Sequence, residues 1–252
     1  MTNGVVIPEA LIDALRSSRH VCVLTGSGIS AESGVPTFRE AQTGLWEKFD
    51  PQELATPEAF LRDPKLVWEW YRWRRQLVAE AEPNPGHRAL ADLASHVEEL
   101  TLITQNVDGL HQRAGSDKVI EFHGNIFDDR CFVEGCLVGD TTDASDVVPI
   151  CPACGGNLRP GVVWFGEAIP EEALSKALSA ASDCDLFFSI GTSSLVWPAA
   201  GLAESAREAG ARIVEVNPDS TPLSNLSDFC LSGNAGRVLP DIVEKLLGPR
   251  SV

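Results

Sequence analysis

Four cysteines between residues 131 and 154 have the number and spacing of a metal site. They form the pattern C-x4-C, fourteen intervening residues, C-x2-C, which is similar to a zinc ribbon with one lengthened knuckle. Four thiolates complete the tetrahedral shell of Zn²⁺ and leave no open position, so the ion would be structural. Free cysteines or two disulfides are the alternative, although a chain without a secretory signal favours metal binding. The four are Cys131, Cys136, Cys151 and Cys154.

A glycine-rich turn follows the apolar run at 21–24 and fits the pattern G-x-G-x-x-A. Glycines let a backbone turn tightly and approach a pyrophosphate, which the N–H groups of a following helix would bind. A tight strand–helix turn without a ligand is the alternative. The acidic residue that ends the second strand of an ordinary dehydrogenase is missing, because residues 41–60 lack a strand pattern. The turn consists of Gly26, Ser27, Gly28, Ile29, Ser30 and Ala31.

Polar clusters also follow the other apolar runs of the chain. Runs rich in β-branched and aromatic residues predict buried strands. Ligands bind at the carboxyl ends of the strands in an open α/β sheet, so these polar residues should meet at one edge. That edge would gather the glycine turn, an Asn/Asp pair, a histidine and a Ser/Thr pair, as in a dinucleotide-handling site. The runs are 21–24, 101–103, 119–122, 186–190 and 212–216.

Helical patterns alternate with these strands, which predicts an α/β fold. The chain of 252 residues fits one large domain with a smaller insert. Residues 127–160 carry no long periodic pattern and contain the cysteine cluster, so they are expected to form the inserted module. The expected helices span about 8–18, 65–81, 86–97, 171–181, 198–209 and 239–247.

Composition narrows the classes of partner. The net charge of −16 and pI near 4.6 disfavour direct binding to nucleic acid, whose phosphates repel an acidic surface. No apolar stretch approaches the roughly 20 residues of a membrane span, and no signal peptide is evident, so a cytoplasmic location is expected. The oligomeric state is left open, with a monomer as the expectation. Three cysteines outside the cluster, Cys22, Cys184 and Cys230, are expected to be small buried residues.

Six sequence blocks resemble those of the sirtuin family and follow one another in the family's order. Two features depart from the family pattern: Ser27 stands where alanine is common, and the first cysteine pair is separated by four residues and not two. The resemblance implies an NAD-dependent protein-lysine deacylase with NAD and one structural zinc ion as cofactors and acylated-lysine proteins or peptides as substrates. The blocks are GSGISAESGVPTFR (26–39), TQNVDGLHQRAG (104–115), HGN (123–125), CPACGG–LRPGVVWFGE (151–167), GTSSLVWPAA (191–200) and NPD (217–219).

The family also implies an architecture and a division of the chain. A large Rossmann-like part would comprise about 1–40, 82–126 and 161–252. A small part would comprise a helical insert at about 41–81 and the zinc module at about 127–160. NAD and the acyl-lysine peptide would meet between the two parts.

Residue roles follow from the same resemblance. His123, at a strand end, would be the general base, since imidazole accepts a proton near neutral pH; a purely structural histidine is the alternative. Asn106 and Asp108 would act beside it, with Gln105, in the nicotinamide and ribose pocket; an Asx-rich turn is the alternative. His20, His87, His96 and His111 are expected to be structural. The remaining cofactor-binding residues would be Phe38 and Arg39 on a mobile loop, Gly191, Thr192, Ser193, Asn217 and Asp219 on the adenosine side, and Ala235 in a C-terminal loop.

The apolar run at 162–165 would pair with the substrate backbone as a strand in this family. Its residues Val163, Trp164 and Phe165 would line the tunnel for the acylated lysine. A plain core strand is the alternative, and both descriptions can hold together.

The helix predicted at 65–81 carries residues that indicate which acyl group would be recognised. Four of its apolar residues share one face and should be core: Leu66, Trp70, Trp73 and Leu77. Tyr71 and Arg74, three residues apart, would be neighbours at the boundary of that face. The spacing Tyr-x-x-Arg resembles class III sirtuins, in which the pair recognises the carboxylate of succinyl- or malonyl-lysine. A boundary tyrosine beside a solvated arginine is the alternative.

Other functions fit the same residues. A general deacetylase would not use Tyr71 and Arg74 for specificity, and a protein ADP-ribosyltransferase would use the same NAD site. A non-catalytic NAD- or zinc-dependent binding module is disfavoured by the intact His123, Asn106 and Asp108.

Overall fold

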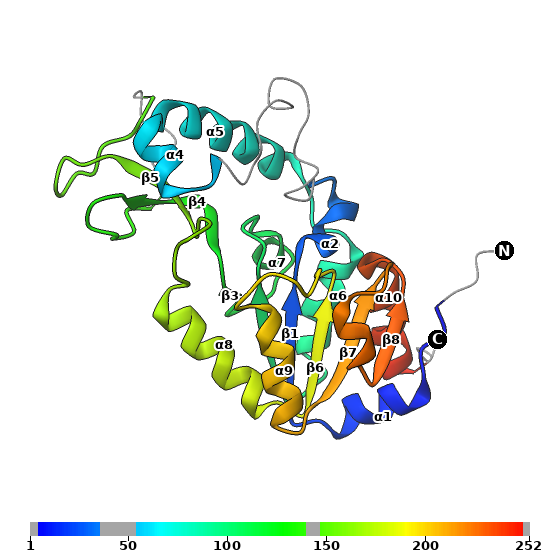
Figure 1. Ribbon diagram of the computed structural model, residues 1–252. Helices are drawn as coiled ribbons and strands as arrows, with labels where there is room; N and C mark the ends of the chain where they lie inside the picture. Colours follow the sequence, from blue (N-terminus) through cyan, green and yellow to red (C-terminus); the bar gives the residue numbers. More distant parts are fainter. Residues whose placement is uncertain (1–4, 36–53, 140–146, 249–252) are drawn as a thin grey trace.

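A twisted sheet of six parallel strands forms the large part of the molecule. The computed structural model describes residues 5–35, 54–139 and 147–248 (Figure 1). The order β3-β2-β1-β6-β7-β8, with every pair parallel, is Rossmann-like and confirms the predicted fold class. The strands are β1 His20–Thr25, β2 Glu99–Thr104, β3 Ile120–Glu121, β6 Leu186–Ile190, β7 Arg212–Asn217 and β8 Phe229–Ser232.

Helices cover both faces of this sheet because side chains alternate along each strand. In β1, Val21 and Val23 pack with the helices of one face, whereas Cys22 and Leu24 pack with those of the other. α1 Glu9–Ser17, α6 Pro85–Ala94 and α10 Ala235–Leu247 cover the first face. α8 Glu171–Asp183 and α9 Ala200–Glu208 cover the second. The short α2 Ser27–Ser30, η1 Ala31–Ser33, α7 Leu110–Arg113 and η3 Pro222–Asn225 lie in the connections.

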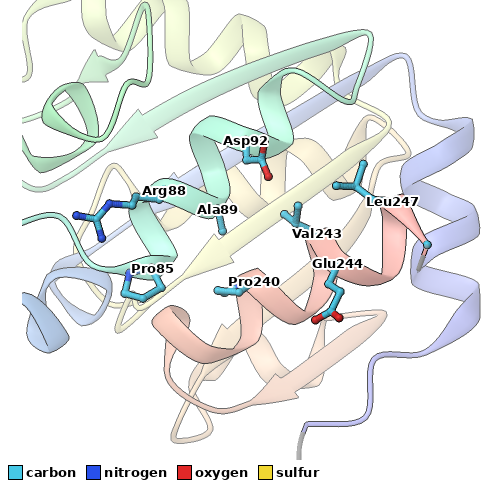
Figure 2. A pocket seen from close by; sticks show the side chains of 9 residues that line it. Pro85, Arg88, Ala89, Asp92, Pro240, Val243, Glu244 and Leu247 are labelled. Atoms are coloured by element: carbon cyan, nitrogen blue, oxygen red, sulfur yellow. The ribbon is translucent and has the colours of Figure 1, made fainter. Parts of the chain in front are cut away.

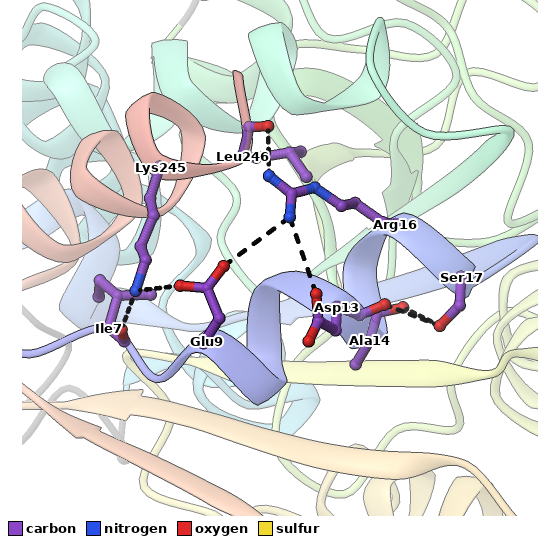
Figure 3. A network of polar contacts seen from close by, with 8 residues as sticks. All are labelled: Ile7, Glu9, Asp13, Ala14, Arg16, Ser17, Lys245 and Leu246. Carbon is purple, nitrogen blue, oxygen red and sulfur yellow. Dashed lines mark hydrogen bonds and ion pairs between the residues drawn. The ribbon is translucent and has the colours of Figure 1, made fainter. Parts of the chain in front are cut away.

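Exposed ion pairs tie the first helix to the last. Lys245 Nζ lies 2.9 Å from a Glu9 carboxylate oxygen and donates to the Ile7 carbonyl at 2.7 Å. Arg16 reaches Glu9, Asp13 and the Leu246 carbonyl (Figure 3). Pairs as exposed as these contribute little to stability, so buried apolar contacts hold α1 in place.

The small part lies beyond the carboxyl ends of the parallel strands (Figure 1). It contains α4 Pro57–Arg62, α5 Pro64–Glu80 and the antiparallel pair β4 Gly124–Cys131 and β5 Leu158–Val162. The Thr56 and Asp63 side chains accept hydrogen bonds from the first-turn N–H groups of α4 and α5, which is why the helices begin there. Its core is rich in aromatic residues, including Phe60, Trp68 and Trp70.

A buried arginine joins α5 to β4. The Arg75 guanidinium lies 2.7 Å from an Asp129 carboxylate oxygen and also donates to the Asp128 carbonyl at 3.0 Å. The side chains of Arg75 and Asp129 are 4% and 0% exposed. Charges buried this deeply are stable only when paired, so the ion pair fixes how α5 lies on β4.

Several predictions about individual elements were wrong. On α5, Trp70 is buried as predicted, but Leu66, Trp73 and Leu77 are only half-buried. The core face instead also includes Val67, Trp68, Tyr71 and Val78. The charged Arg75 also lies on that face, paired with Asp129, and apolar spacing alone does not predict a charged residue there. Cys230 is exposed on the outer strand β8, while Cys22 and Cys184 are buried as expected. No helix of the described ranges is long and apolar enough to cross a membrane.

Candidate functional site

The glycine turn at 26–31 packs closely against the carboxyl end of β6. Gly28 N–H donates to the Gly191 carbonyl at 2.9 Å, and Gly26 N–H donates to the Ile190 carbonyl at 3.0 Å. A Cβ on Gly28 would lie 2.6 Å from the Gly191 Cα, and one on Gly26 would lie 2.8 Å from the Gly191 oxygen. The glycines at 26 and 28 are therefore required by contact between two strand-end loops. Ser27 and Ala31 are exposed, Gly28 is half-buried, and Ile29 and Ser30 are buried.

Ser30 joins the two polar residues that follow β2. Its hydroxyl donates to Asp108 Oδ2 at 2.7 Å and accepts from Asn106 Nδ2 at 2.9 Å. Asn106 Nδ2 also donates to the Gly26 carbonyl at 3.1 Å. Leu110 N–H, at the first residue of α7, donates to the other Asp108 oxygen at 3.0 Å. Burial raises the pKa of Asp108, against the hydrogen bonds from Leu110 and Ser30 that lower it. The structure thus brings together three predicted residues from two loops.

Two buried histidines lie directly beneath this network. The rings of His87 and His111 meet edge to face with centroids 4.8 Å apart. His111 Nε2 lies 2.9 Å from Thr25 Oγ1, and His87 Nε2 lies 3.4 Å from Ser30 Oγ. Burial lowers the pKa of His87 to about 4 and that of His111 to about 3, so both are neutral at pH 7. Their burial agrees with the structural role expected of them.

His123 lies between β3 and β4 and shares a contact with the loop after β2. Its Nδ1 is 3.1 Å from the Gln105 carbonyl oxygen. A carbonyl can only accept, so this contact assigns the proton of the neutral ring to Nδ1 and leaves Nε2 with a free lone pair. Burial lowers the pKa of His123, which keeps the ring neutral at pH 7. Nε2 is therefore the atom that can accept a proton.

The residues predicted for the adenosine side follow β6 and β7. Asn217 Nδ2 donates to the Thr192 carbonyl at 2.7 Å, which joins the two loops. Ser193 and Asp219 are exposed. Ala235 is not in a loop: it is the buried first residue of α10, since the helix begins earlier than its apolar spacing indicated. Phe38 and Arg39 lie outside the described residues.

Tyr71 and Arg74 are neighbours on α5, as predicted. The Arg74 guanidinium carbon lies 6.0 Å from the centre of the Tyr71 ring and 4.9 Å from that of Trp70. Tyr71 is 1% exposed, so it is a core residue and not a boundary one. Its hydroxyl accepts a hydrogen bond from Trp164 Nε1 at 2.9 Å. Burial raises the pKa of Tyr71 and lowers that of Arg74, while the Arg74 charge favours the ionised phenol.

The apolar run at 162–165 lies next to His123. β5 ends at Val162, and Val163 N–H donates to the His123 carbonyl at 2.8 Å. Phe165 N–H donates to the Ala55 carbonyl at 3.0 Å, which connects the run to the segment before α4. Trp164 is buried, Val163 is half-buried and Phe165 is 45% exposed.

The two cysteine turns have the same backbone closure. Cys131 N–H donates to the carbonyl five residues on, that of Cys136, and Cys151 N–H donates likewise to that of Gly156. In each turn the residue four positions on is a glycine with positive φ, Gly135 or Gly155. The backbones of the two turns therefore match, and the longer spacing of the first pair reflects only the place of its second thiol.

The thiols of these turns converge. Those of Cys131, Cys136 and Cys151 lie within 4.8 Å of one another, and the Sγ atoms of Cys131 and Cys154 are 3.4 Å apart. Zn–S bonds of about 2.3 Å in a tetrahedron separate sulfur atoms by about 3.8 Å. The cluster therefore fits one structural zinc ion.

Two hollows elsewhere contain none of the predicted site residues. A groove of about 680 Å³ runs between α6 and α10, with Arg88, Asp92, Pro240 and Glu244 among its lining residues (Figure 2). A smaller hollow of about 310 Å³, lined in part by Ser18 and Arg212, lies near the amino ends of β1 and β7.

Sequence reasoning missed several residues that hold the site together. Thr25 donates to Thr104 Oγ1 at 2.8 Å, and Thr104 in turn accepts from the Asn106 N–H at 3.1 Å. Asn84 caps α6 and donates to the Ile29 carbonyl at 2.6 Å. The Asn-Pro before α6 is a capping signal that indicates Asn84, whereas nothing in the sequence pairs Thr25 with Thr104 before the strand order is known.

Known proteins are similar to this chain over nearly its whole length. The model of the Sir2 family matches residues 26–198. An NAD-dependent protein deacylase 2 of Pyrobaculum aerophilum is 52% identical over 234 residues, which are 93% of this chain and 94% of the relative. The crystal structure of a Sir2 homologue–NAD complex superposes with a TM-score of 0.91 at 42% identity and covers 98% of this chain and 96% of its own.

A second solved structure is a mutant Sir2 homologue in complex with 2′-O-acetyl ADP-ribose. It superposes with a TM-score of 0.89 at 42% identity, covering 96% of this chain and 97% of its own. These matches confirm the resemblance that the sequence blocks indicate. The chain belongs to the Sir2 family of NAD-dependent protein deacylases.

Proposed function

We propose that this protein removes acyl groups from protein lysine side chains in an NAD-dependent reaction that transfers the acyl group to ADP-ribose, and that it favours succinyl and malonyl groups. The family and its relatives named as deacylases support the reaction. The observation that supports it most directly within the chain is His123, whose Nδ1 faces the Gln105 carbonyl and whose Nε2 remains available as a base.

NAD would lie along the carboxyl edge of the sheet. The glycine turn at 26–31 and the loops after β6 and β7 would hold its phosphates and adenosine. Gln105, Asn106 and Asp108 would hold the nicotinamide end, with Asn106 and Asp108 already oriented by Ser30. NAD, when bound, would release nicotinamide and supply the ribose that receives the acyl group, and His123 Nε2 would be the atom that takes up the proton of a ribose hydroxyl.

The zinc ion would be held by all four cysteines of the cluster, Cys131, Cys136, Cys151 and Cys154. With every position filled by a thiolate, the ion stabilises the small part and takes no part in catalysis. The acylated lysine would enter between the two parts, beside Val163, Trp164 and Phe165.

The acidic-acyl preference is supported by Tyr71 and Arg74. A guanidinium can form two parallel hydrogen bonds to a carboxylate, and a phenol can donate a third. The two side chains lie together on α5, and Trp164 of the 162–165 run contacts Tyr71. An acetyl group is smaller and carries no carboxylate, so it would fit the same pocket without using the pair.

The catalytic role is tested by His123→Asn, with nicotinamide release from NAD and an acylated peptide as the measurement. Loss of a general base is expected to lower kcat about 100- to 10,000-fold. His96→Asn is the matched control, because His96 lies after α6 and bonds to the Asp92 carbonyl of its own helix. Turnover that survives in His123→Asn at the wild-type rate would refute the assignment.

The acyl preference is tested by kcat/KM on one peptide carrying acetyl-lysine or succinyl-lysine. Arg74→Met is expected to lower the value for succinyl-lysine about 10- to 150-fold, the range for a hydrogen bond to a charged group, and to spare acetyl-lysine. Arg72→Met on the same helix is the control, since Arg72 packs over Trp68 instead. Equal losses on both peptides would show a general deacetylase.

A further inference from the structure

We infer that Trp164, held in place by Arg159 and Glu167, is a positioning residue that turns the Tyr71 hydroxyl so that its proton points to the acyl carboxylate. The inference rests on the proposed function, because it explains how one of the two acyl-reading side chains is oriented. It assigns a role in substrate selectivity to residues of β5 and the following loop.

The hydrogen bond between the two rings has only one direction. Indole Nε1–H is a donor and never an acceptor, so the Tyr71 oxygen accepts from Trp164 at 2.9 Å. The phenol keeps its own proton, and among the described residues it donates that proton to no group. The hydroxyl is thus left as a donor for a group that is not part of the protein.

The Tyr71 ring itself is fixed by its neighbours. It meets Trp70 edge to face with ring centres 4.7 Å apart and lies 6.5 Å from the centre of the Trp164 ring. With the ring fixed, rotation about the C–O bond is the freedom that remains, and the indole donor restricts it. A buried phenol without this donor could turn its proton away from the substrate.

Trp164 in turn packs against the buried guanidinium of Arg159. The Arg159 guanidinium carbon lies 3.4 Å from the centre of the Trp164 ring, a cation–π contact. Arg159 pairs with both carboxylate oxygens of Glu167. One of these oxygens, Oε2, also accepts a hydrogen bond from the backbone N–H of Trp164 at 2.8 Å. The carboxylate therefore anchors both the backbone of Trp164 and the cation that lies on its ring.

The contacts that link Arg159, Trp164 and Tyr71 would distinguish acyl groups by their charge. A succinyl carboxylate needs the phenol as a donor beside Arg74, so a randomly turned hydroxyl would weaken its binding. An acetyl group offers no carboxylate and is indifferent to the direction of the hydroxyl. Loss of the indole donor should therefore change selectivity more than it changes deacetylation.

The kinetic test compares Trp164→Phe with Trp68→Phe. Trp68 is buried in the same cluster, but its indole donates to the Leu158 carbonyl at 2.8 Å. Trp68→Phe therefore removes the same amount of packing and one indole hydrogen bond, as Trp164→Phe does, without removing the hydrogen bond to Tyr71. Trp164→Phe is expected to lower the succinyl-to-acetyl ratio of kcat/KM roughly 2- to 12-fold, the range for one neutral hydrogen bond. Trp68→Phe should leave that ratio at the wild-type value.

Arg159→Lys is a second variant, should Trp164→Phe fail to fold. It keeps both the indole and the charge but removes the planar group that lies on the Trp164 ring. The ratio should fall in the same direction. A ratio unchanged in a folded variant of either kind, or one that falls equally in Trp68→Phe, would overturn the inference.

A spectroscopic test of the hydrogen bond is independent of catalysis. The indole N–H signal of Trp164, identified as the one that Trp164→Phe or Trp164→His lacks, should move upfield in Tyr71→Phe because its acceptor is gone. An unmoved signal overturns the inference whatever the kinetics. If the wild-type enzyme has no succinyl preference, both the proposed acyl specificity and the selectivity role of Trp164 are refuted. A moved indole signal would then show that the hydrogen bond between Trp164 and Tyr71 exists and that the proposed function is what failed.

Discussion

The carboxyl edge of the large sheet and the small part above it are held together by different kinds of interaction. At the sheet edge, hydroxyl, amide and neutral imidazole groups such as those of Thr25, Ser30 and His111 bond to one another, and Ser30 also donates to the Asp108 carboxylate. In the small part, full charges are buried in pairs, Arg75 with Asp129 and Arg159 with Glu167, and cysteine thiols converge. At the sheet edge a carboxylate is bound by neutral donors, whereas in the small part these two carboxylates are each paired with an arginine.

The sizes of their apolar cores account for this difference. Helices cover the six-stranded sheet on both faces, so its polar network rests on two extensive aliphatic clusters. The small part has only two strands and two helices described around one cluster. A small core supplies little stability, so a metal ion and paired charges contribute more. The comparison predicts that each region has its own weakness.

Zinc loss should have the largest effect and should act on the small part alone. Structural zinc binding contributes an apparent 10–16 kcal/mol in small domains. A strong chelator, or Cys131→Ser, is expected to shift tryptophan emission to longer wavelength because Trp68, Trp70 and Trp164 become solvated, while most helical circular dichroism persists. Cys230→Ser, at an exposed thiol, is the control. Unchanged emission after proven zinc removal would contradict the comparison.

Removal of one buried charge should have the next largest effect. Arg75→Met leaves the Asp129 carboxylate without its guanidinium at 0% exposure and is expected to lower the free energy of unfolding by about 3–5 kcal/mol. Urea unfolding measures this, with Arg72→Met on the same helix as control. The double variant Arg75→Met/Asp129→Asn should recover part of the loss, and a double variant no more stable than the single one would argue against the ion pair.

A fall of one pH unit below about pH 6.5 should have the smallest effect, and it should act on the sheet edge. His87 and His111 have folded pKa values of about 4 and about 3, below the ordinary value near 6.5. Between these values the unfolded chain binds protons that the folded chain does not, so the free energy of unfolding falls as the pH falls. The slope is up to about 1.4 kcal/mol per pH unit for each histidine.

The measurement is the urea midpoint from pH 6.5 to pH 4. The slope should be shallower in His111→Asn than in wild type, and His96→Asn should match wild type. Equal slopes in all three proteins would show that the buried pair does not titrate as described.

The sequence was most informative where elements obey a simple periodicity. β6 was predicted to the residue, since LFFSI is a continuous apolar run between a helix and a glycine. α5 was predicted as a helix, and Trp70 was correctly placed in the core, but the rest of the predicted core face was wrong because the pattern of apolar residues cannot anticipate a buried, paired Arg75. β4 was not predicted, since GNIFDDRC mixes apolar and charged residues and its pairing with β5 depends on the folded zinc module.

The candidate site shows the same distinction. Residues that match a short motif, such as His123 and Asn106, could be proposed from the motif alone. Thr25, Arg159 and Glu167 were not, because their partners come from other strands or from across a turn. Contacts of this kind depend on sheet order, which propensity and spacing do not encode.

The close approach of the two strand-end loops limits how this chain can vary. A methyl group on Gly28 would lie 2.6 Å from the Gly191 Cα, and one on Gly191 would lie 2.6 Å from the Ile29 nitrogen and 2.7 Å from the Gly28 carbonyl carbon. Since both obstacles are main-chain atoms, no second substitution can make room for the first. In a saturation library, both positions should accept glycine alone, and a search for suppressors of Gly28→Ala should recover only revertants.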